Sequence, residues 1–128
     1  MTSSLELPLT TKRLIIGHII ICSGCCCGVV NRGKPEVPVE WLKQQWRARG
    51  LLKNIQLTIS CCLGPCDLTN VVKVSGPDVE VWLGKINRFD QYSSLADWAE
   101  QSKSAGALLP LPADFNGLRF SPFHSANR

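Results

Sequence analysis

All seven cysteines of this 128-residue chain fall within two short stretches, residues 22–27 and 61–66. They are Cys22, Cys25, Cys26, Cys27, Cys61, Cys62 and Cys66. Thiols that serve only as small core residues have no reason to gather at two points, whereas metal sites collect thiolates from a few loops. The sequence therefore predicts a fold that brings two loops together around a metal centre.

The length and composition indicate one intracellular domain. Hydrophobic residues make up 45% of the chain and charged residues 19%, which is typical of a globular protein. An odd number of cysteines would leave one thiol over in a disulfide scaffold, so metal-bound thiolates in a reducing compartment explain them better. The apolar run 14–21 is too short to span a membrane, and bulky Ile21 does not suit a signal-peptide cleavage site. We expect a cytoplasmic protein without a membrane span.

Periodicity and turn residues divide the chain into alternating strands and helices. The expected strands are residues 14–21, 55–60, 71–75 and 79–83, and the expected helices are residues 39–49 and 89–101. The continuous β-branched composition of the first strand is typical of burial on both sheet faces. The order is strand, helix, three strands, helix. We expect a flexible leader at 1–11, a domain at 12–102 and an extended tail at 103–128.

This order predicts an open α/β sheet with both cysteine stretches at one edge. A right-handed strand–helix–strand crossover makes the first two strands parallel, so the loops that follow them leave the same edge. Strand alternation predicts that Cys61 points into the core with Ile59, whereas Cys62 points the other way, toward a ligand. In the first loop Cys22 lies at the strand exit, and spacing does not decide whether Cys25, Cys26 or Cys27 joins it.

The C-x4-C and C-x3-C pairs, with Cys-Leu-Gly-Pro-Cys at residues 62–66, resemble those of the thioredoxin-like [2Fe-2S] ferredoxins. That family includes cluster-bearing small subunits of NADH dehydrogenases and bidirectional hydrogenases. The resemblance covers about residues 13–101 and implies a thioredoxin-like sheet. It also implies that Cys22, Cys27, Cys62 and Cys66 bind a [2Fe-2S] cluster. The Gly-Cys-Cys-Cys-Gly run and residues 32–35 further resemble small bacterial (2Fe-2S) ferredoxin-domain proteins.

Three functions suit this set of thiols. An all-cysteine [2Fe-2S] cluster would make the chain a one-electron carrier between a reductase and an acceptor enzyme, and not itself an enzyme. The same thiolates would also form a zinc or cobalt site in a metal-handling protein. Alternatively, the C-x-x-C formed by Cys22 and Cys25 would support thiol or sulfur-transfer chemistry. His18 and His124 have no catalytic companion in the sequence, and Asp67 is a candidate both for turn capping and for tuning the site's charge.

The charge distribution bears on partners. Residues 1–60 contain eight Lys or Arg against three Asp or Glu, whereas residues 61–128 contain six against seven. The basic residues near the first cysteine loop include Arg32 and Lys34, and they favour an acidic redox partner as well as a plain solvated face. No basic–aromatic pattern supports nucleic-acid binding. Trp41 is a candidate contact for a partner or for a second copy of the chain in a homodimer.

Overall fold

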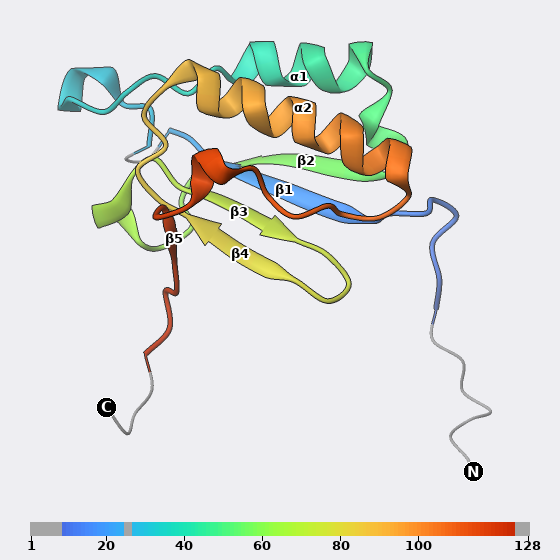
Figure 1. Ribbon diagram of the computed structural model, residues 1–128. Helices are drawn as coiled ribbons and strands as arrows, with labels where there is room; N and C mark the ends of the chain where they lie inside the picture. Colours follow the sequence, from blue (N-terminus) through green and yellow to red (C-terminus); the bar gives the residue numbers. More distant parts are fainter. Residues whose placement is uncertain (1–8, 25–26, 125–128) are drawn as a thin grey trace.

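Two helices cover one face of a five-stranded sheet in the computed structural model, which describes residues 9–24 and 27–124 (Figure 1). The elements are β1 (Gly17–Cys22), α1 (Val39–Ala48), β2 (Ile55–Ser60), β3 (Val72–Ser75), β4 (Glu80–Leu83), α2 (Phe89–Ala105) and β5 (Arg119–Phe120). The strand order is β2-β1-β3-β4-β5. The predicted α/β class and the order of the first six elements are confirmed. None of the helices in this described part is long and apolar enough to cross a bilayer.

The sheet is mixed. β1 and β2 are parallel, with Gly17 opposite Ile55 and Cys22 opposite Ser60, as the crossover through α1 requires. β3, β4 and β5 each pair antiparallel with the preceding strand in the sheet order. Because β1 and β2 end side by side, both cysteine stretches begin at the same edge of the sheet.

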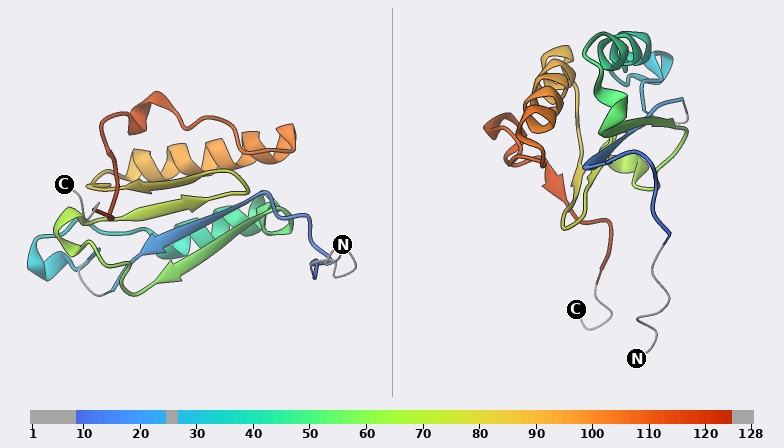
Figure 2. Two further views of the ribbon diagram at one scale, coloured as in Figure 1. Left: turned by 90° about the horizontal axis from the view of Figure 1, so that it is seen from below. Right: turned by 90° about the vertical axis from the view of Figure 1, so that its right-hand side faces the viewer.

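β1 is buried on one face, not on two as its composition suggested. Ile19 and Ile21 have no exposed surface under the helices, whereas His18 and Ile20 on the opposite face are partly exposed. The reason is that both helices lie on the same side of the sheet (Figure 2). The chain between β2 and β3 forms only a 3-10 turn at Cys66–Leu68, so no helix within residues 9–24 and 27–124 covers the other face. Leu14, expected at the start of the strand, is 78% exposed.

The core lies between the helices and the sheet. Leu42 and Trp46 of α1 and Leu95 and Trp98 of α2 are all buried against it. Trp46 also donates its Nε1–H to the carbonyl of Ile55 at 3.0 Å, which ties α1 to the first residue of β2. Burying side chains of this size supplies most of the stability of a domain this small.

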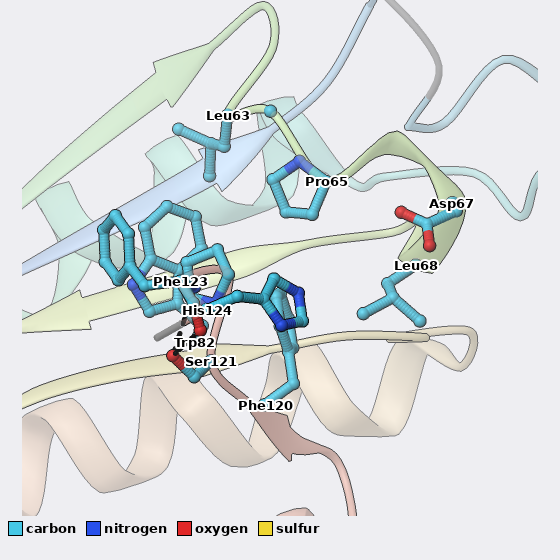
Figure 3. Close-up of a pocket in the computed structure, with 11 residues that line it drawn as sticks. Leu63, Pro65, Asp67, Leu68, Trp82, Phe120, Ser121, Phe123 and His124 are labelled. Carbon is cyan, nitrogen blue, oxygen red and sulfur yellow. Dashed lines mark hydrogen bonds between the residues drawn. The ribbon is translucent and has the colours of Figure 1, made fainter. Parts of the chain in front are cut away.

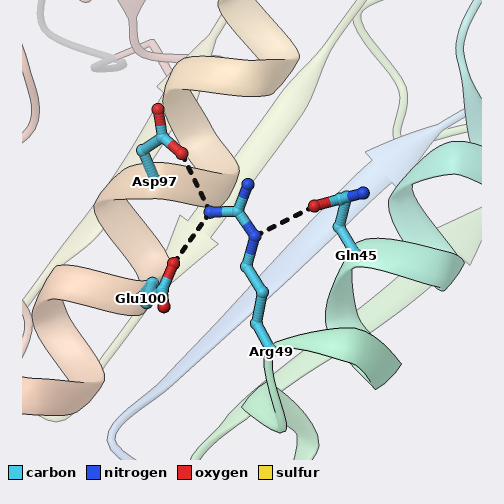
Figure 4. A network of polar contacts seen from close by, with 4 residues as sticks. All are labelled: Gln45, Arg49, Asp97 and Glu100. Atoms are coloured by element: carbon cyan, nitrogen blue, oxygen red, sulfur yellow. Dashed lines mark hydrogen bonds and ion pairs between the residues drawn. The ribbon is translucent and has the colours of Figure 1, made fainter.

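The helices are joined to each other by one ion-pair network (Figure 4). Arg49, just after α1, binds Asp97 at 2.8 Å and Glu100 at 3.1 Å on α2, and its Nε–H donates to Gln45 at 3.0 Å. Arg49 is one of the eight Lys or Arg residues of the first 60, whose positive charge favours an acidic partner as well as a solvated face. Its charge is instead satisfied within the protein.

The segment after α2 is extended, as predicted, but it packs back onto the domain. Trp98 donates its Nε1–H to the carbonyls of Leu109 and Pro110 at 2.9 and 3.1 Å, and Phe115 is fully buried. β5 then adds to the edge of the sheet beside β4. Residues 1–8 of the expected leader and residues 125–128 of the expected tail lie outside the described part.

Candidate metal centre at the cysteine loops

Three of the four expected ligands lie on one small cavity at the ends of β1 and β2. Cys22, Cys27 and Cys62 line it together with Val71 and the Leu63–Pro65 segment. Cys22 is the last residue of β1, and Cys62 is the second residue after β2. The two loops therefore meet, as parallel pairing of the two strands requires.

The fourth expected ligand is only partly described. Cys66 opens the 3-10 turn Cys66–Leu68 directly after Pro65, which lines the cavity, but its side chain lies outside the described part. Cys25 and Cys26, the alternative ligands in the first loop, lie there as well. Among the side chains that are described, no group of three or more His, Cys, Asp or Glu converges to hold a single metal ion.

Cys61 corrects one expectation. We predicted that it continues the apolar face of β2 into the core, yet it is exposed and does not line the cavity. β2 ends at Ser60 and the chain bends at the next residue, so side-chain alternation no longer applies there. Cys62, which we predicted to point toward a ligand, lines the cavity and is exposed.

The backbone at the cavity holds the first cysteine loop by hydrogen bonds. The Val71 N–H donates to Sγ of Cys27 at 3.3 Å, and the Cys22 thiol donates to the Cys61 carbonyl at 3.5 Å. The Ser23 N–H donates to the Ser60 carbonyl at 2.8 Å, which joins the two loops directly. An amide N–H directed at a sulfur stabilises a thiolate, and hydrogen bonds of this kind tune iron–sulfur clusters.

The side chain of Asn70 holds the first cysteine loop in place by hydrogen bonds. It is completely buried, and its Oδ1 accepts the Gly28 N–H at 2.8 Å, next to Cys27. Its Nδ2 donates to the carbonyls of Pro35 and Ile86 at 2.8 and 3.1 Å. One side chain thus connects the first cysteine loop with the segments that precede α1 and α2. Sequence reasoning missed Asn70, because a single asparagine beside an apolar strand carries no pattern.

Tyr92 closes the buried side of the centre. Burial raises the pKa of its phenol well above the ordinary value, and the nearby Cys27 acts in the same direction. Its hydroxyl lies near Asn70, which opposes that shift, but it makes no hydrogen bond of acceptable geometry. Among the described residues, the hydroxyls of Tyr92 and Thr69 are the buried side-chain groups without a hydrogen-bond partner.

The cysteines are chemically suited to bind a sulfur-ligated group, but the two loops lie close together around the cavity. Thiolates from two loops are the donors that iron–sulfur clusters, zinc and copper(I) prefer. The cavity leaves no room for a water molecule, so a bound group requires the sulfur atoms to separate. Gly64 has open space where a Cβ would project, and so does Gly24 in the opposite loop. The solvent side of each loop is therefore open at its glycine.

His18 and Trp41 do not belong to this centre. His18 is held through Nε2 by the Thr58 hydroxyl at 2.6 Å, on the face of the sheet that lacks helices. Trp41 is partly exposed, as expected, and its ring packs edge-on against Phe89 with centroids 4.6 Å apart.

Comparison of the sequence with protein-family models and with curated proteins gives no match. Among solved structures, the chain is similar to the wild-type thioredoxin-like [2Fe-2S] ferredoxin from Aquifex aeolicus, at 18% identity and a TM-score of 0.48. That match covers 84% of this chain and 98% of the other. A second structure of a thioredoxin-like [2Fe-2S] ferredoxin from the same organism matches at 20% identity and a TM-score of 0.47, over 84% and 92% of the two chains. At these values the likeness concerns the arrangement of strands and helices, and the cluster remains a property of those proteins.

Proposed function

We propose that this chain binds a [2Fe-2S] cluster through Cys22, Cys27, Cys62 and Cys66 and carries single electrons between two redox enzymes. The observation that carries the proposal is the meeting of Cys22, Cys27 and Cys62 on one cavity, from loops 34 residues apart in sequence. Cys66 follows within four residues of Cys62 and completes two pairs, one from each loop.

The pairing of donors favours a two-iron cluster over a single ion. Each iron of a [2Fe-2S] cluster takes two protein thiolates, so the ligands need to converge only in pairs. A structural zinc ion requires four donors around one point. The two cysteine pairs, one from each loop, suit the first arrangement, and the content of iron, sulfide and zinc distinguishes it from the second.

When bound, the cluster would supply a one-electron couple, and the protein would set its surroundings. The Val71 N–H directed at Cys27 would lower the electron density on that sulfur. The nearly complete burial of Cys22 and Cys27 would keep water from one side, while Cys62 would face solvent and a partner. Hydrogen bonds to sulfur and solvent exposure are two of the factors that set the potential of such clusters.

The test is the stoichiometry of iron, acid-labile sulfide and zinc in protein purified without oxygen. The proposal predicts about two irons and two sulfides per chain, from the composition of the cluster. One zinc or cobalt per chain without sulfide would establish the metal-handling alternative instead. A protein that stays free of iron after anaerobic reconstitution would rule the proposal out.

A further inference from the structure

A second and larger cavity lies beside the cysteine centre, with a volume of about 410 Å³ (Figure 3). Leu63, Gly64 and Pro65 line both cavities, so a single segment of chain separates them. The remaining walls come from Asp67 and Leu68 of the 3-10 turn, from Trp82 of β4, and from Phe120 of β5 with the four residues that follow it. A cavity of this volume is within the range of small-molecule sites.

One wall of the cavity is aromatic and fixed in place. The ring centroids of Trp82 and Phe120 are 6.0 Å apart, and those of Trp82 and Phe123 are 6.5 Å apart. Trp82 donates its Nε1–H to Glu80 at 3.0 Å, and the Lys73 ammonium lies 5.0 Å from its ring centroid. The wall is therefore ordered without any occupant, which lowers the entropic cost of binding one.

Phe123 is the clearest sign that the wall has an occupant. Its side chain is 70% exposed, although a phenyl ring gains by burial. The Ser121 hydroxyl accepts the Phe123 N–H at 3.2 Å and donates to its carbonyl at 3.3 Å, which turns the chain back toward Trp82. Phe123 is exposed and Trp82 and Phe120 are partly exposed, and aromatic groups gathered in this way at a cavity are typical of a binding surface.

The polar groups define the ligand further. The carboxylate of Asp67 and the imidazole of His124 lie at the rim, and the apolar Leu63 and Pro65 face the aromatic wall from the other side (Figure 3). No lysine or arginine lines the cavity among residues 9–24 and 27–124. A carboxylate accepts N–H donors and repels anions.

We propose that this cavity binds an uncharged planar heteroaromatic ring, which packs between Pro65 and the aromatic wall and donates an N–H to Asp67. The shape of the site selects a planar ligand, and its aromatic side chains select an aromatic ring. Its single carboxylate selects a ligand that is uncharged and donates an N–H. The inference stands on the cavity alone and does not depend on the cluster.

Riboflavin is the probe, because its ring system is planar and uncharged and has an imide N–H. Equilibrium dialysis in the dark measures binding whatever the colour of the protein. We expect saturable binding of one riboflavin per chain, weakened at least five-fold in Phe123→Ala, as the loss of one stacking partner implies. Phe89→Ala is the matched control, because Phe89 is a 53% exposed phenyl group paired with Trp41 on α1. It should bind riboflavin as the wild type does.

Riboflavin 5′-phosphate tests the role of the carboxylate. The wild type should bind riboflavin 5′-phosphate more weakly than riboflavin. In Asp67→Asn the difference between these two affinities should be smaller. The proposal is overturned if riboflavin does not bind saturably up to its solubility limit, or if Phe123→Ala and Phe89→Ala bind it equally. An iron and sulfide assay on the same sample reports on the cluster separately, so the two proposals can fail independently.

Discussion

The helix-covered face of the sheet and the edge that holds the cysteines are built in different ways. Under the helices, the side chains of Ile19, Ile21 and Leu95 pack with no exposed surface and contribute apolar burial. At the edge, the buried residues include the polar Thr69 and Asn70, and hydrogen bonds from one side chain connect the loops. The difference teaches that the core depends on apolar packing, whereas the position of the cysteine loops depends on a few specific hydrogen bonds.

The sharpest test of this difference is Cys27→Ser, for which we expect complete loss of the cluster with the fold intact. The hydroxyl of serine is a poorer ligand than a thiolate for iron in a cluster. Iron and sulfide content and far-ultraviolet circular dichroism measure the two properties. Cys61→Ser is the matched control, because Cys61 is exposed and lies off the cavity, and Cys26→Ser serves the same purpose within the first loop. Equal or greater loss of the cluster in Cys26→Ser would show that the ligands of the first loop were assigned wrongly.

The opposite outcome is expected for Trp46→Ala under the helices. Removal of this 1% exposed side chain should cost about 3–5 kcal/mol of the free energy of unfolding. Urea denaturation measures it, with Trp41→Ala as the control because Trp41 is partly exposed. Molecules that remain folded should still contain the cluster. This account predicts that the cluster content of Trp46→Ala falls only as far as the fraction of folded protein falls. A Trp46→Ala protein that is folded but contains no iron would contradict it.

The sequence predicts the strands of the sheet better than the details of the cysteine edge. β2 was predicted with its observed bounds, Ile55–Ser60, because its residues alternate between a covered and an open face. The first strand was placed too early, because a continuous apolar run does not show where pairing begins. β5 has only two residues, Arg119–Phe120, and so few residues have no period to detect.

The meeting of the two cysteine loops followed from topology, but the details of the centre did not. Parallel pairing brings Cys22 and Ser60 to one edge whatever the loops contain. The position of Cys61 depends on where β2 stops, which alternation does not reveal. The hydrogen bonds of Asn70 span 16 to 42 residues of sequence, and no local pattern encodes them.

Asn70→Ala should disturb both regions, since this residue joins them. It leaves the partly buried Gly28 N–H and the carbonyls of Pro35 and Ile86 without their partner, at a cost of about 2–4 kcal/mol. We also expect faster loss of the cluster on exposure to a chelator, followed by its visible absorbance. Asn54→Ala is the control, because Asn54 makes a single exposed hydrogen bond to the Leu14 carbonyl. If both variants lose the cluster at the same rate, Asn70 does not position the first loop.

The smallest expected effect lies on the open face, at His18. Burial, and then the charge of Lys73, lowers the pKa of His18 below its ordinary value of 6.5. Protonation is thus less favourable in the folded state, so stability should fall as pH decreases through about 6.5 toward the lower native pKa. The His18→Gln variant should lose this part of the pH dependence in urea denaturation between about pH 7 and 5. An unchanged profile in His18→Gln would show that His18 does not contribute.

The central claim is that sulfur atoms from both loops hold a pair of irons that takes up one electron. Electron paramagnetic resonance of the dithionite-reduced protein tests it most directly. The account predicts a signal of a reduced [2Fe-2S] cluster that integrates to about one spin per chain and is absent before reduction. A protein that contains metal but gives no such signal after anaerobic reduction would contradict it.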